Sequence, residues 1–306
     1  MRIVFMGTPT FAVPSLAALC SRHEVVLVVT QPDRASGRGT CARPTAVKEA
    51  ALDFGLPVMQ PTRLDAGAIQ AIRDAAPDLI AVAAFGMLLP AEVLSIPPLG
   101  CVNVHASLLP KYRGAAPIER SILAGDDVTG VSIMRMEFGL DTGPYALQRS
   151  VPIGEGYTAD VEAALAHEGA TALLEVLDEI TAGTVQWIEQ DESAATYASK
   201  ITKDDVALRP EYGVREAYRR VRAASRRAPA RACLGDKELT VVRAMPVDPH
   251  VAAGAVCLVD GAPVLGVADG GLRLDIVRPS GKGDMTGIDW ARGARLDEDV
   301  CWRCTR

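Results

Sequence analysis

The chain has 306 residues, a formal net charge of −6 and 49% hydrophobic residues, which is ordinary for a globular protein with one large domain or two smaller ones. No apolar run approaches the ~18 residues of a membrane span, and seven scattered Cys residues favour reduced thiols over a disulfide framework. We therefore expect a cytoplasmic protein without a transmembrane segment, whose overall negative charge argues against nonspecific nucleic-acid binding.

The first two-thirds of the chain alternates between apolar strands and helical segments. Continuously apolar strands separated by helices are typical of a parallel sheet that is covered on both faces. The last two strands are closely spaced, so we expect them to form a hairpin or an edge extension. The predicted strands are Arg2–Gly7, Glu24–Asp33, Asp78–Gly86, Gly100–Ser107, Val128–Met136 and Tyr145–Ile153, and the predicted helices are Thr10–Cys20, Ala46–Gly55, Asp65–Ala76 and Tyr157–Gly183.

A second region follows a stretch without a convincing regular pattern. It begins with a basic helix, Val214–Ser225, and continues with short strand-like pieces separated by glycine-containing turns, which suggests a small barrel. We therefore expect an α/β domain with a Rossmann-like parallel sheet at 1–189, a linker at 190–208 and a small OB-like β-barrel domain at 209–306. The strand-like pieces are Ala232–Gly235, Leu239–Met245, Ala255–Asp260, Pro263–Ala268 and Leu272–Pro279.

The charge is unevenly distributed between these regions. Residues Asp205–Arg306 hold 17 Lys and Arg against 14 Asp and Glu, and Arg209–Arg231 alone holds eight Arg and two acidic residues. A basic segment on an acidic protein suggests an anionic partner for that segment. A solvated helix face would give the same composition.

Asn103 and His105 lie at the end of an apolar strand, immediately before the turn signal of Leu108–Pro110. Ligands of open parallel sheets bind at the carboxyl ends of the strands. Residues two apart on a strand point to the same side, so both side chains can reach one substrate atom. Asn can stabilise a developing oxyanion, and His can donate a hydrogen bond or move a proton. A His whose bonds are satisfied in the interior is the alternative.

Asp141, in the sequence GLDTG, follows another strand and is flanked by glycines. Its carboxylate could orient His105 and accept a proton through water, although Asp is also a common turn residue. No Ser or Cys has a compelling activating context, since Ser107 could equally cap the turn. Asn103, His105 and Asp141 therefore suit direct transfer to an incoming nucleophile through a tetrahedral intermediate. No metal is expected, because the histidines lack ligand spacing.

Several stretches of the sequence match a known family over nearly the whole chain. They are MRIVFMGTPTFAVPSL, VVTQPDRASGRG, PDLIAVAAFGMLLP, NVHASLLPKYRGAAPI, TGVSIMRMEFGLDTG, TYASKITKDD and GKGDMTGIDWARG. The N-x-H-x-S-L-L-P run followed by D-T-G is similar to enzymes that use 10-formyltetrahydrofolate. Together with GTPTFAVPSL and the carboxy-terminal match, it resembles the bacterial methionyl-tRNA formyltransferase family.

This resemblance implies a one-carbon group transferase in translation initiation. The amine of methionyl initiator tRNA would attack the formyl carbon of 10-formyltetrahydrofolate. Asn103 and His105 would stabilise the oxyanion, and Asp141 would assist proton removal and hold His105. The resemblance further implies no metal and no membrane, and we expect a monomer.

The resemblance also implies binding residues for the folate donor and for the tRNA. The carboxy-terminal barrel would hold the tRNA backbone through basic groups. Arg38 and Arg43 would approach the acceptor end of the tRNA. The donor site would comprise Phe85, Gly86, Met87, Leu88, Leu89, Ser107, Leu108, Leu109, Pro110, Gly139 and Leu140.

Two segments depart from the family pattern. Residues 40–42 read TCA where lysines usually follow GRG, and Ser225–Ala232 reads SRRAPARA where members commonly carry a segment like NPWPGA. Three other functions stay open from the residues alone. These are a formyltransferase acting on a nucleotide-linked amino sugar, a folate-binding hydrolase that releases formate, and a non-catalytic RNA-binding module.

Overall fold

The computed structural model describes residues 1–35, 42–248, 251–296 and 300–304, and the chain forms two compact units. The first unit comprises Met1–Pro117, Asp127–Gly154 and Asp160–Ser199. The second comprises Ile118–Asp126, Glu155–Ala159 and Lys200–Arg306. Within the described ranges, no helix has the length and apolar character needed to cross a membrane.

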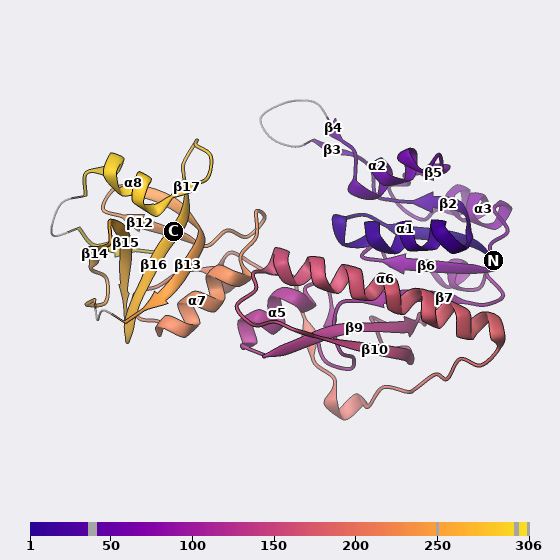
Figure 1. Ribbon diagram of the computed structural model, residues 1–306. Coiled ribbons are helices and arrows are strands. Elements are labelled where there is room, and N and C mark those ends of the chain that lie inside the picture. The colour runs from indigo at the N-terminus through magenta and orange to yellow at the C-terminus, as the bar shows by residue number, and fades with distance from the viewer. Residues whose placement is uncertain (36–41, 249–250, 297–299, 305–306) are drawn as a thin grey trace. The chain divides into compact units, whose positions relative to one another are not determined.

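A seven-stranded sheet forms the centre of the first unit (Figure 1). Its order is β10-β9-β7-β6-β1-β2-β5; the five strands from β7 to β5 pair in parallel, and β9 and β10 add an antiparallel edge. The strand order reverses at β1, which pairs with β2 on one side and with β6 on the other. The strands are β1 (Arg2–Gly7), β2 (Glu24–Val29), β5 (Val58–Met59), β6 (Leu79–Ala83), β7 (Cys101–His105), β9 (Val128–Arg135) and β10 (Tyr145–Pro152).

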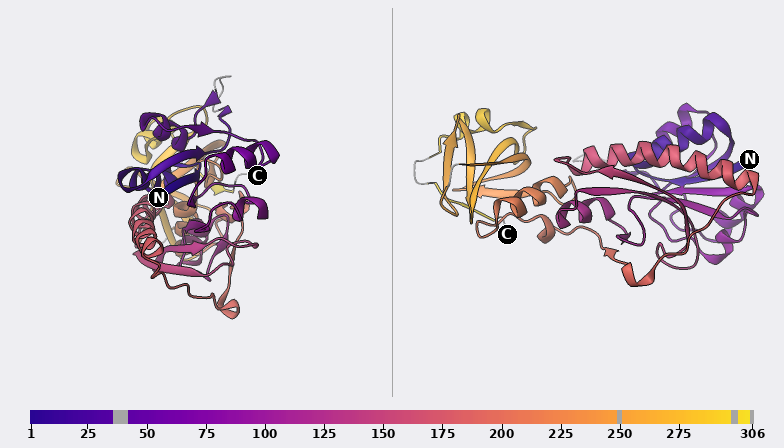
Figure 2. Two further views of the ribbon diagram at one scale, coloured as in Figure 1. Left: turned by 90° about the vertical axis from the view of Figure 1, so that its right-hand side faces the viewer. Right: turned by 60° about the horizontal axis from the view of Figure 1, so that its bottom comes forward.

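Helices cover both faces of this sheet (Figures 1 and 2). Thr45 and Asp65 cap α2 and α3, since their side chains accept hydrogen bonds from the backbone N–H of Lys48 and Ala68. The long helix α6 approaches the sheet closely at Gly169, where an added Cβ would lie 2.6 Å from Val104. The elements are the 3₁₀ helix η1 (Thr10–Ala12) and the helices α1 (Val13–Arg22), α2 (Ala46–Asp53), α3 (Ala66–Asp74), α4 (Ala91–Leu94) and α6 (Thr158–Ala182).

Two pairs of very short strands complete the first unit. β3 (Arg34–Ala35) and β4 (Ala42–Arg43) pair antiparallel on either side of residues 36–41. β8 (Arg113–Gly114) pairs in parallel with β11 (Tyr197–Ala198), which follows the 3₁₀ helix η2 (Glu192–Ala194). Residues 190–199 thus belong to the first unit, whereas the sequence predicts a linker at 190–208. A two-residue strand is too short to give a periodic pattern in the sequence.

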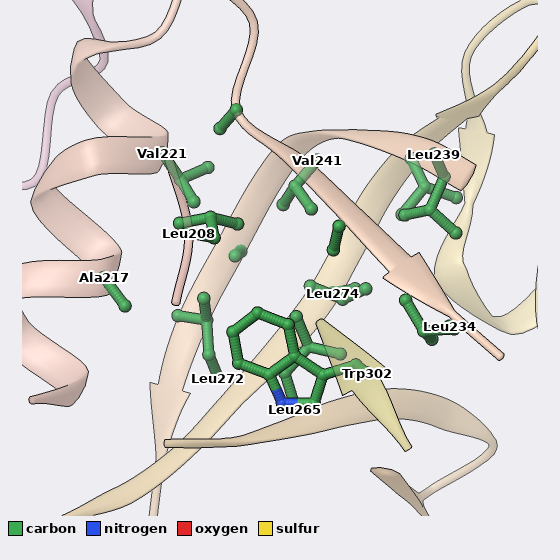
Figure 3. Close-up of a cluster of buried hydrophobic side chains, with 14 of the residues drawn as sticks. Leu208, Ala217, Val221, Leu234, Leu239, Val241, Leu265, Leu272, Leu274 and Trp302 are labelled. Carbon is green, nitrogen blue, oxygen red and sulfur yellow. The ribbon is translucent and has the colours of Figure 1, made fainter. Parts of the chain in front are cut away.

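The second unit is built on an antiparallel sheet of order β14-β15-β16-β13-β12-β18, with β17 paired to β16. The amphipathic helix α7 contributes Ala217 and Val221 to its core, and Trp302 lies in the same cluster beside Leu265 (Figure 3). The strands are β12 (Arg231–Leu234), β13 (Lys237–Val247), β14 (Val256–Val259), β15 (Ala262–Val267), β16 (Gly270–Pro279), β17 (Met285–Thr286) and β18 (Trp302–Arg303), and the helices are α5 (Pro117–Ala124), η3 (Asp204–Val206), α7 (Val214–Ala223) and α8 (Gly287–Ala294). The predicted order of a Rossmann-like α/β sheet followed by a small β domain is confirmed.

Candidate active site

Asn103 and His105 project from β7, whose five residues are all buried. They are two residues apart, so the alternation of the strand directs both side chains to one face of the sheet. Asn103 is 9% exposed and His105 5% exposed, and β7 ends at His105. The strand therefore presents an amide and an imidazole together at its carboxyl end, where open α/β sheets bind their ligands.

Both ring nitrogens of His105 face oxygen atoms. Nε2 lies 3.0 Å from the carbonyl oxygen of Tyr112, and Nδ1 lies 3.6 Å from Oδ2 of Asp141. A carbonyl oxygen only accepts hydrogen bonds, so Nε2 carries a proton in this arrangement. Nδ1 is then the ring nitrogen that faces the carboxylate of Asp141.

Asp141 lies in a tight turn between β9 and β10, with a left-handed backbone at φ +55°. Its Oδ2 accepts a hydrogen bond of 2.8 Å from the backbone N–H of Gly114. Gly143 has no room for a side chain, because an added Cβ would overlap the carbonyl oxygen of Arg135. The carboxylate is thus fixed by a backbone donor on one side and the backbone turn on the other.

The segment Ser107–Pro110 is held from β9 and β10. Ser132 donates to the carbonyl oxygen of Ser107 at 2.6 Å and accepts from the N–H of Leu109 at 3.0 Å. Gln148 donates to the carbonyl oxygen of Leu109 at 2.8 Å. The hydroxyl of Ser107 donates to the Lys111 carbonyl, so Ser107 stabilises this turn.

The segment Phe85–Leu89 follows β6, the strand beside β7. Phe85 and Leu89 are buried in the apolar core, whereas Leu88 is 80% exposed. The carbonyl oxygen of Phe85 accepts bonds of 3.0 Å from both Thr8 and Gln31. This segment therefore offers mainly backbone atoms and Leu88 to a ligand, and Leu140 beside Asp141 is also half exposed.

Cys101, at the start of β7, is not a nucleophile in this site. Burial raises the pKa of its thiol to about 12, so it stays protonated at neutral pH. Among the residues that the structure describes, no three His, Cys, Asp or Glu side chains gather as a metal-binding group. The geometry supports acid–base and oxyanion chemistry by Asn103, His105 and Asp141 without a covalent enzyme intermediate.

Comparison with known proteins agrees with this geometry. A family model described as formyl transferase matches residues 1–177. A methionyl-tRNA formyltransferase of Halorhodospira halophila is 46% identical over 301 residues, which cover 96% of this chain and 97% of the relative. One of Methylococcus capsulatus is 45% identical and covers 97% of this chain and 98% of the relative. This chain belongs to the methionyl-tRNA formyltransferase family. The resemblance inferred from the sequence motifs is confirmed.

Solved structures share the fold of this family member at lower identity. HypX from Aquifex aeolicus in complex with tetrahydrofolic acid aligns with a TM-score of 0.67 at 17% identity, covering 95% of this chain and 46% of that one. An N-formyltransferase from Helicobacter canadensis in complex with folinic acid and dTDP-3-aminofucose aligns with a TM-score of 0.69 at 16% identity, covering 90% and 98%. At these identities the likeness supports the fold alone.

The two arginines predicted to approach tRNA fall in and beside the segment between β3 and β4. Arg43 is exposed at the end of β4. Arg38 and the altered residues Thr40 and Cys41 lie outside the described residues.

Most arginines of the basic helix α7 are engaged within the second unit. Arg222 is 7% exposed and donates twice to the carbonyl oxygen of Gly156. Arg220 donates to the carbonyl oxygens of Asp204 and Asp205, and Arg219 donates to that of Ala124. These three arginines stabilise the unit. The exposed arginines of the basic segment are Arg209, Arg215, Arg226, Arg227 and Arg231.

The segment Ser225–Ala232, which departs from the expected family pattern, packs through its alanines. Ala228, Ala230 and Ala232 are buried, while Arg226 and Arg227 face solvent. A turn in which Ser225 N–H donates to the carbonyl oxygen of Ala228 holds this arrangement. The segment therefore keeps a packed start of the β domain and exposes positive charge.

Sequence reasoning missed three residues around the Asp141 turn of this family member. Arg113 is fully buried and donates to Gln190 and to Glu192. Gln190 in turn donates to the backbone of the Asp141 turn. The only sequence signal was the position of Arg113 directly after the Ser107–Pro110 segment, since Gln190 lies 49 residues beyond Asp141.

Proposed function

We propose that this protein transfers the formyl group of 10-formyltetrahydrofolate to the free amino group of methionyl initiator tRNA. The observation that carries the proposal is the convergence of Asn103 and His105 on one face of β7, with Asp141 3.6 Å from the His105 ring. The relatives that align over nearly the whole chain are methionyl-tRNA formyltransferases, which supports the tRNA substrate.

The residues of the site transfer the proton and stabilise the charge that this reaction requires. One C–N bond forms between the amine and the formyl carbon, the bond to N10 of the folate breaks, and one proton passes from the amine to N10. Asn103 donates a hydrogen bond to the oxyanion that develops on the formyl group, and His105 donates a second one from Nδ1, because its Nε2 is bonded to the Tyr112 carbonyl. Asp141 holds His105 and takes up the proton of the amine through water.

The exposed side chains near these residues support the predicted donor site. The segment Phe85–Leu89 follows β6, the segment Ser107–Pro110 follows β7, and Gly139–Leu140 directly precedes Asp141. The exposed Leu88 and Leu140 suit the flat apolar faces of a pterin.

The second unit would hold the tRNA backbone. Arg226 and Arg227, with Arg209, Arg215 and Arg231, are exposed side chains that attract phosphates without reading sequence. Arg38 and Arg43 would approach the acceptor end. We further expect a cytoplasmic monomer, as suits an enzyme of translation initiation; sedimentation at assay concentration tests the monomer.

A direct formylation assay tests the proposal. Purified protein is incubated with 10-formyltetrahydrofolate and either charged initiator tRNA or a nucleotide-linked amino sugar, and the formylated product is measured. We expect a formylated product when the acceptor is charged initiator tRNA and none when it is the amino sugar. Formylation of the sugar and not of the tRNA would establish the alternative, an amino-sugar formyltransferase. Formate release without either acceptor would indicate a hydrolase.

A further inference from the structure

Gln190 connects a distant part of the chain to the backbone of the Asp141 turn. Its Nε2 donates to the carbonyl oxygens of Asp141 at 2.8 Å and Gly143 at 2.6 Å, and its Oε1 accepts from Nε of Arg113 at 2.9 Å. The side chain is 9% exposed. Only one orientation of the amide satisfies all three partners, because the reverse would place an oxygen against two carbonyl oxygens.

Arg113 fixes Gln190 from the other side. Its guanidinium is fully buried, and it also donates to both carboxylate oxygens of Glu192 at 2.9 and 2.7 Å. Hydrogen bonding with Arg113 lowers the pKa of Glu192, so the pair is ionised at neutral pH. A buried arginine is costly unless its donors have partners, and here Gln190, Glu192 and Tyr197 all lie downstream of α6. The fully buried guanidinium of Arg113 therefore bonds the same Gln190 amide that holds the Asp141 turn.

The residues on either side of Arg113 contact the catalytic side chains directly. The carbonyl oxygen of Tyr112 pairs with Nε2 of His105, and the N–H of Gly114 donates to Oδ2 of Asp141. Tyr112 and Gly114 both have positive φ, at +60° and +116°. Glycine adopts such a backbone readily, but Tyr112 keeps it only where the surroundings hold it in place.

Thr196, the residue before β11, holds the tripeptide Tyr112–Gly114 in place. The N–H of Arg113 donates to the carbonyl oxygen of Thr196 at 2.8 Å, and the hydroxyl of Thr196 accepts from the N–H of Tyr112 at 2.8 Å. The segment that carries Gln190, Glu192 and Thr196 thus reaches both sides of the His105–Asp141 pair. It does so through the backbone of Tyr112–Gly114 and through the turn at Asp141.

We infer that Gln190 is a positioning residue for catalysis: with Arg113 behind it, it locks the left-handed turn that aims the Asp141 carboxylate at His105. Asp141 has φ +55°, a left-handed backbone that is unfavourable for an L-residue, so external bonds help to keep the turn. Gln190 supplies two of them. The inference rests on the proposed roles of His105 and Asp141 in formyl transfer.

The decisive variant is Gln190→Glu. It keeps the acceptor for Arg113 but replaces the two donated bonds with repulsion between the carboxylate and two carbonyl oxygens. We expect kcat to fall about 10- to 100-fold, the scale of a small misplacement of a catalytic group, with both KM values within about threefold. Gln186→Glu is the matched control, since Gln186 is exposed and bonds only to the Thr184 carbonyl. It should keep wild-type kcat.

A double-mutant cycle separates positioning from general damage to the fold. In the Asp141→Asn background the left-handed turn remains compatible with the side chain, but the charge is lost. There Gln190→Glu should change kcat less than about twofold, because the group that it positions no longer acts. An equal loss in both backgrounds, or no loss in either, would overturn the inference.

Hydrogen exchange at the Gly114 amide gives a readout that does not depend on activity. Its N–H is bonded to Asp141, so Gln190→Glu should speed its exchange about tenfold or more, and Gln186→Glu should not. Unchanged exchange at Gly114 in Gln190→Glu contradicts the inference. This result does not depend on whether the wild type formylates tRNA, so the inference and the proposed function can fail separately. If Gln190→Glu does not fold, Glu192→Gln takes its place, because it weakens the same chain of bonds from its exposed end. That variant should lower kcat about threefold or more at unchanged KM, and unaltered kcat would count against the inference.

Discussion

Arginines lie both near the Asp141 turn and on the basic helix α7, but their burial and their partners give them different roles. Near the turn, the fully buried Arg113 donates to Gln190, and Gln190 donates to the backbone of Asp141, the candidate catalytic residue. On α7, Arg219, Arg220 and Arg222 bond backbone carbonyls and hold the second unit together. The number of charges in a segment therefore says little about function until each partner is known.

The largest effect should come from the reacting groups themselves. His105→Ala and Asp141→Ala should each lower the formylation rate at least ~100-fold, the loss expected when acid–base or oxyanion help is removed. Single-turnover assays with charged initiator tRNA measure it. Near-wild-type rates in both variants would refute the site assignment.

The next largest effect compares the buried Arg222 with the exposed Arg215 on α7. Arg222→Met removes two bonds to the Gly156 carbonyl from a side chain that is 7% exposed, which should cost about 2 kcal/mol of unfolding free energy in the second unit. Arg215→Met alters an exposed side chain and should change the free energy of unfolding by no more than about 0.5 kcal/mol. Urea denaturation followed by tryptophan fluorescence compares them, and equal losses would mean that burial does not distinguish the two arginines.

A smaller effect is expected from the exposed arginines. The double variant Arg226→Ala and Arg227→Ala should raise KM for tRNA several-fold, leave kcat nearly unchanged, and reduce the slope of log affinity against log salt by up to about two. The double variant of Arg219 and Arg220 to Met, compared at the same ionic strengths, should instead reduce stability. An unchanged salt slope in the first variant would show that these exposed charges do not meet phosphates.

The smallest effect concerns acid stability. Burial raises the pKa of Asp205, but hydrogen bonds from Arg120 and Thr202 outweigh this and hold it below the ordinary value of 3.8. The ionised carboxylate therefore stabilises the second unit above that value, and the stabilisation is lost as pH falls below it. Asp205→Asn should be less stable than wild type at pH 7 and lose less further stability on acidification. Parallel pH profiles of the unfolding midpoint for the two proteins would refute this.

The sequence predicted the fold and the candidate site where local patterns carry the information. Asn103 and His105 follow from strand alternation, and Asp141 from its glycine-flanked turn. α8 was missed because Gly287 and Gly293 weaken its helical signal, although Thr286 caps it and Trp290 is buried on it. α5 was missed because it begins with a proline and spans only Pro117–Ala124.

The support of the site could not be predicted in the same way. Gln190 touches residues 47, 49 and 77 positions away, and no periodicity marks such a contact. No sequence pattern marks Arg113 as buried, and its bonds to Gln190 and Glu192 are known only from the structure. Contacts between side chains and remote backbone carbonyls are set by the tertiary fold, which a local pattern does not encode.

The pairing of β8 with β11 has a practical consequence for protein engineering. A chimera that joins this catalytic unit to another carboxy-terminal domain needs its junction after Ser199, although residues 1–177 already match the family model. A junction at the end of α6 would discard the only strand that pairs with Arg113–Gly114 among the described residues. Such a hybrid would carry Asn103, His105 and Asp141 in its sequence and still be expected to lose their alignment.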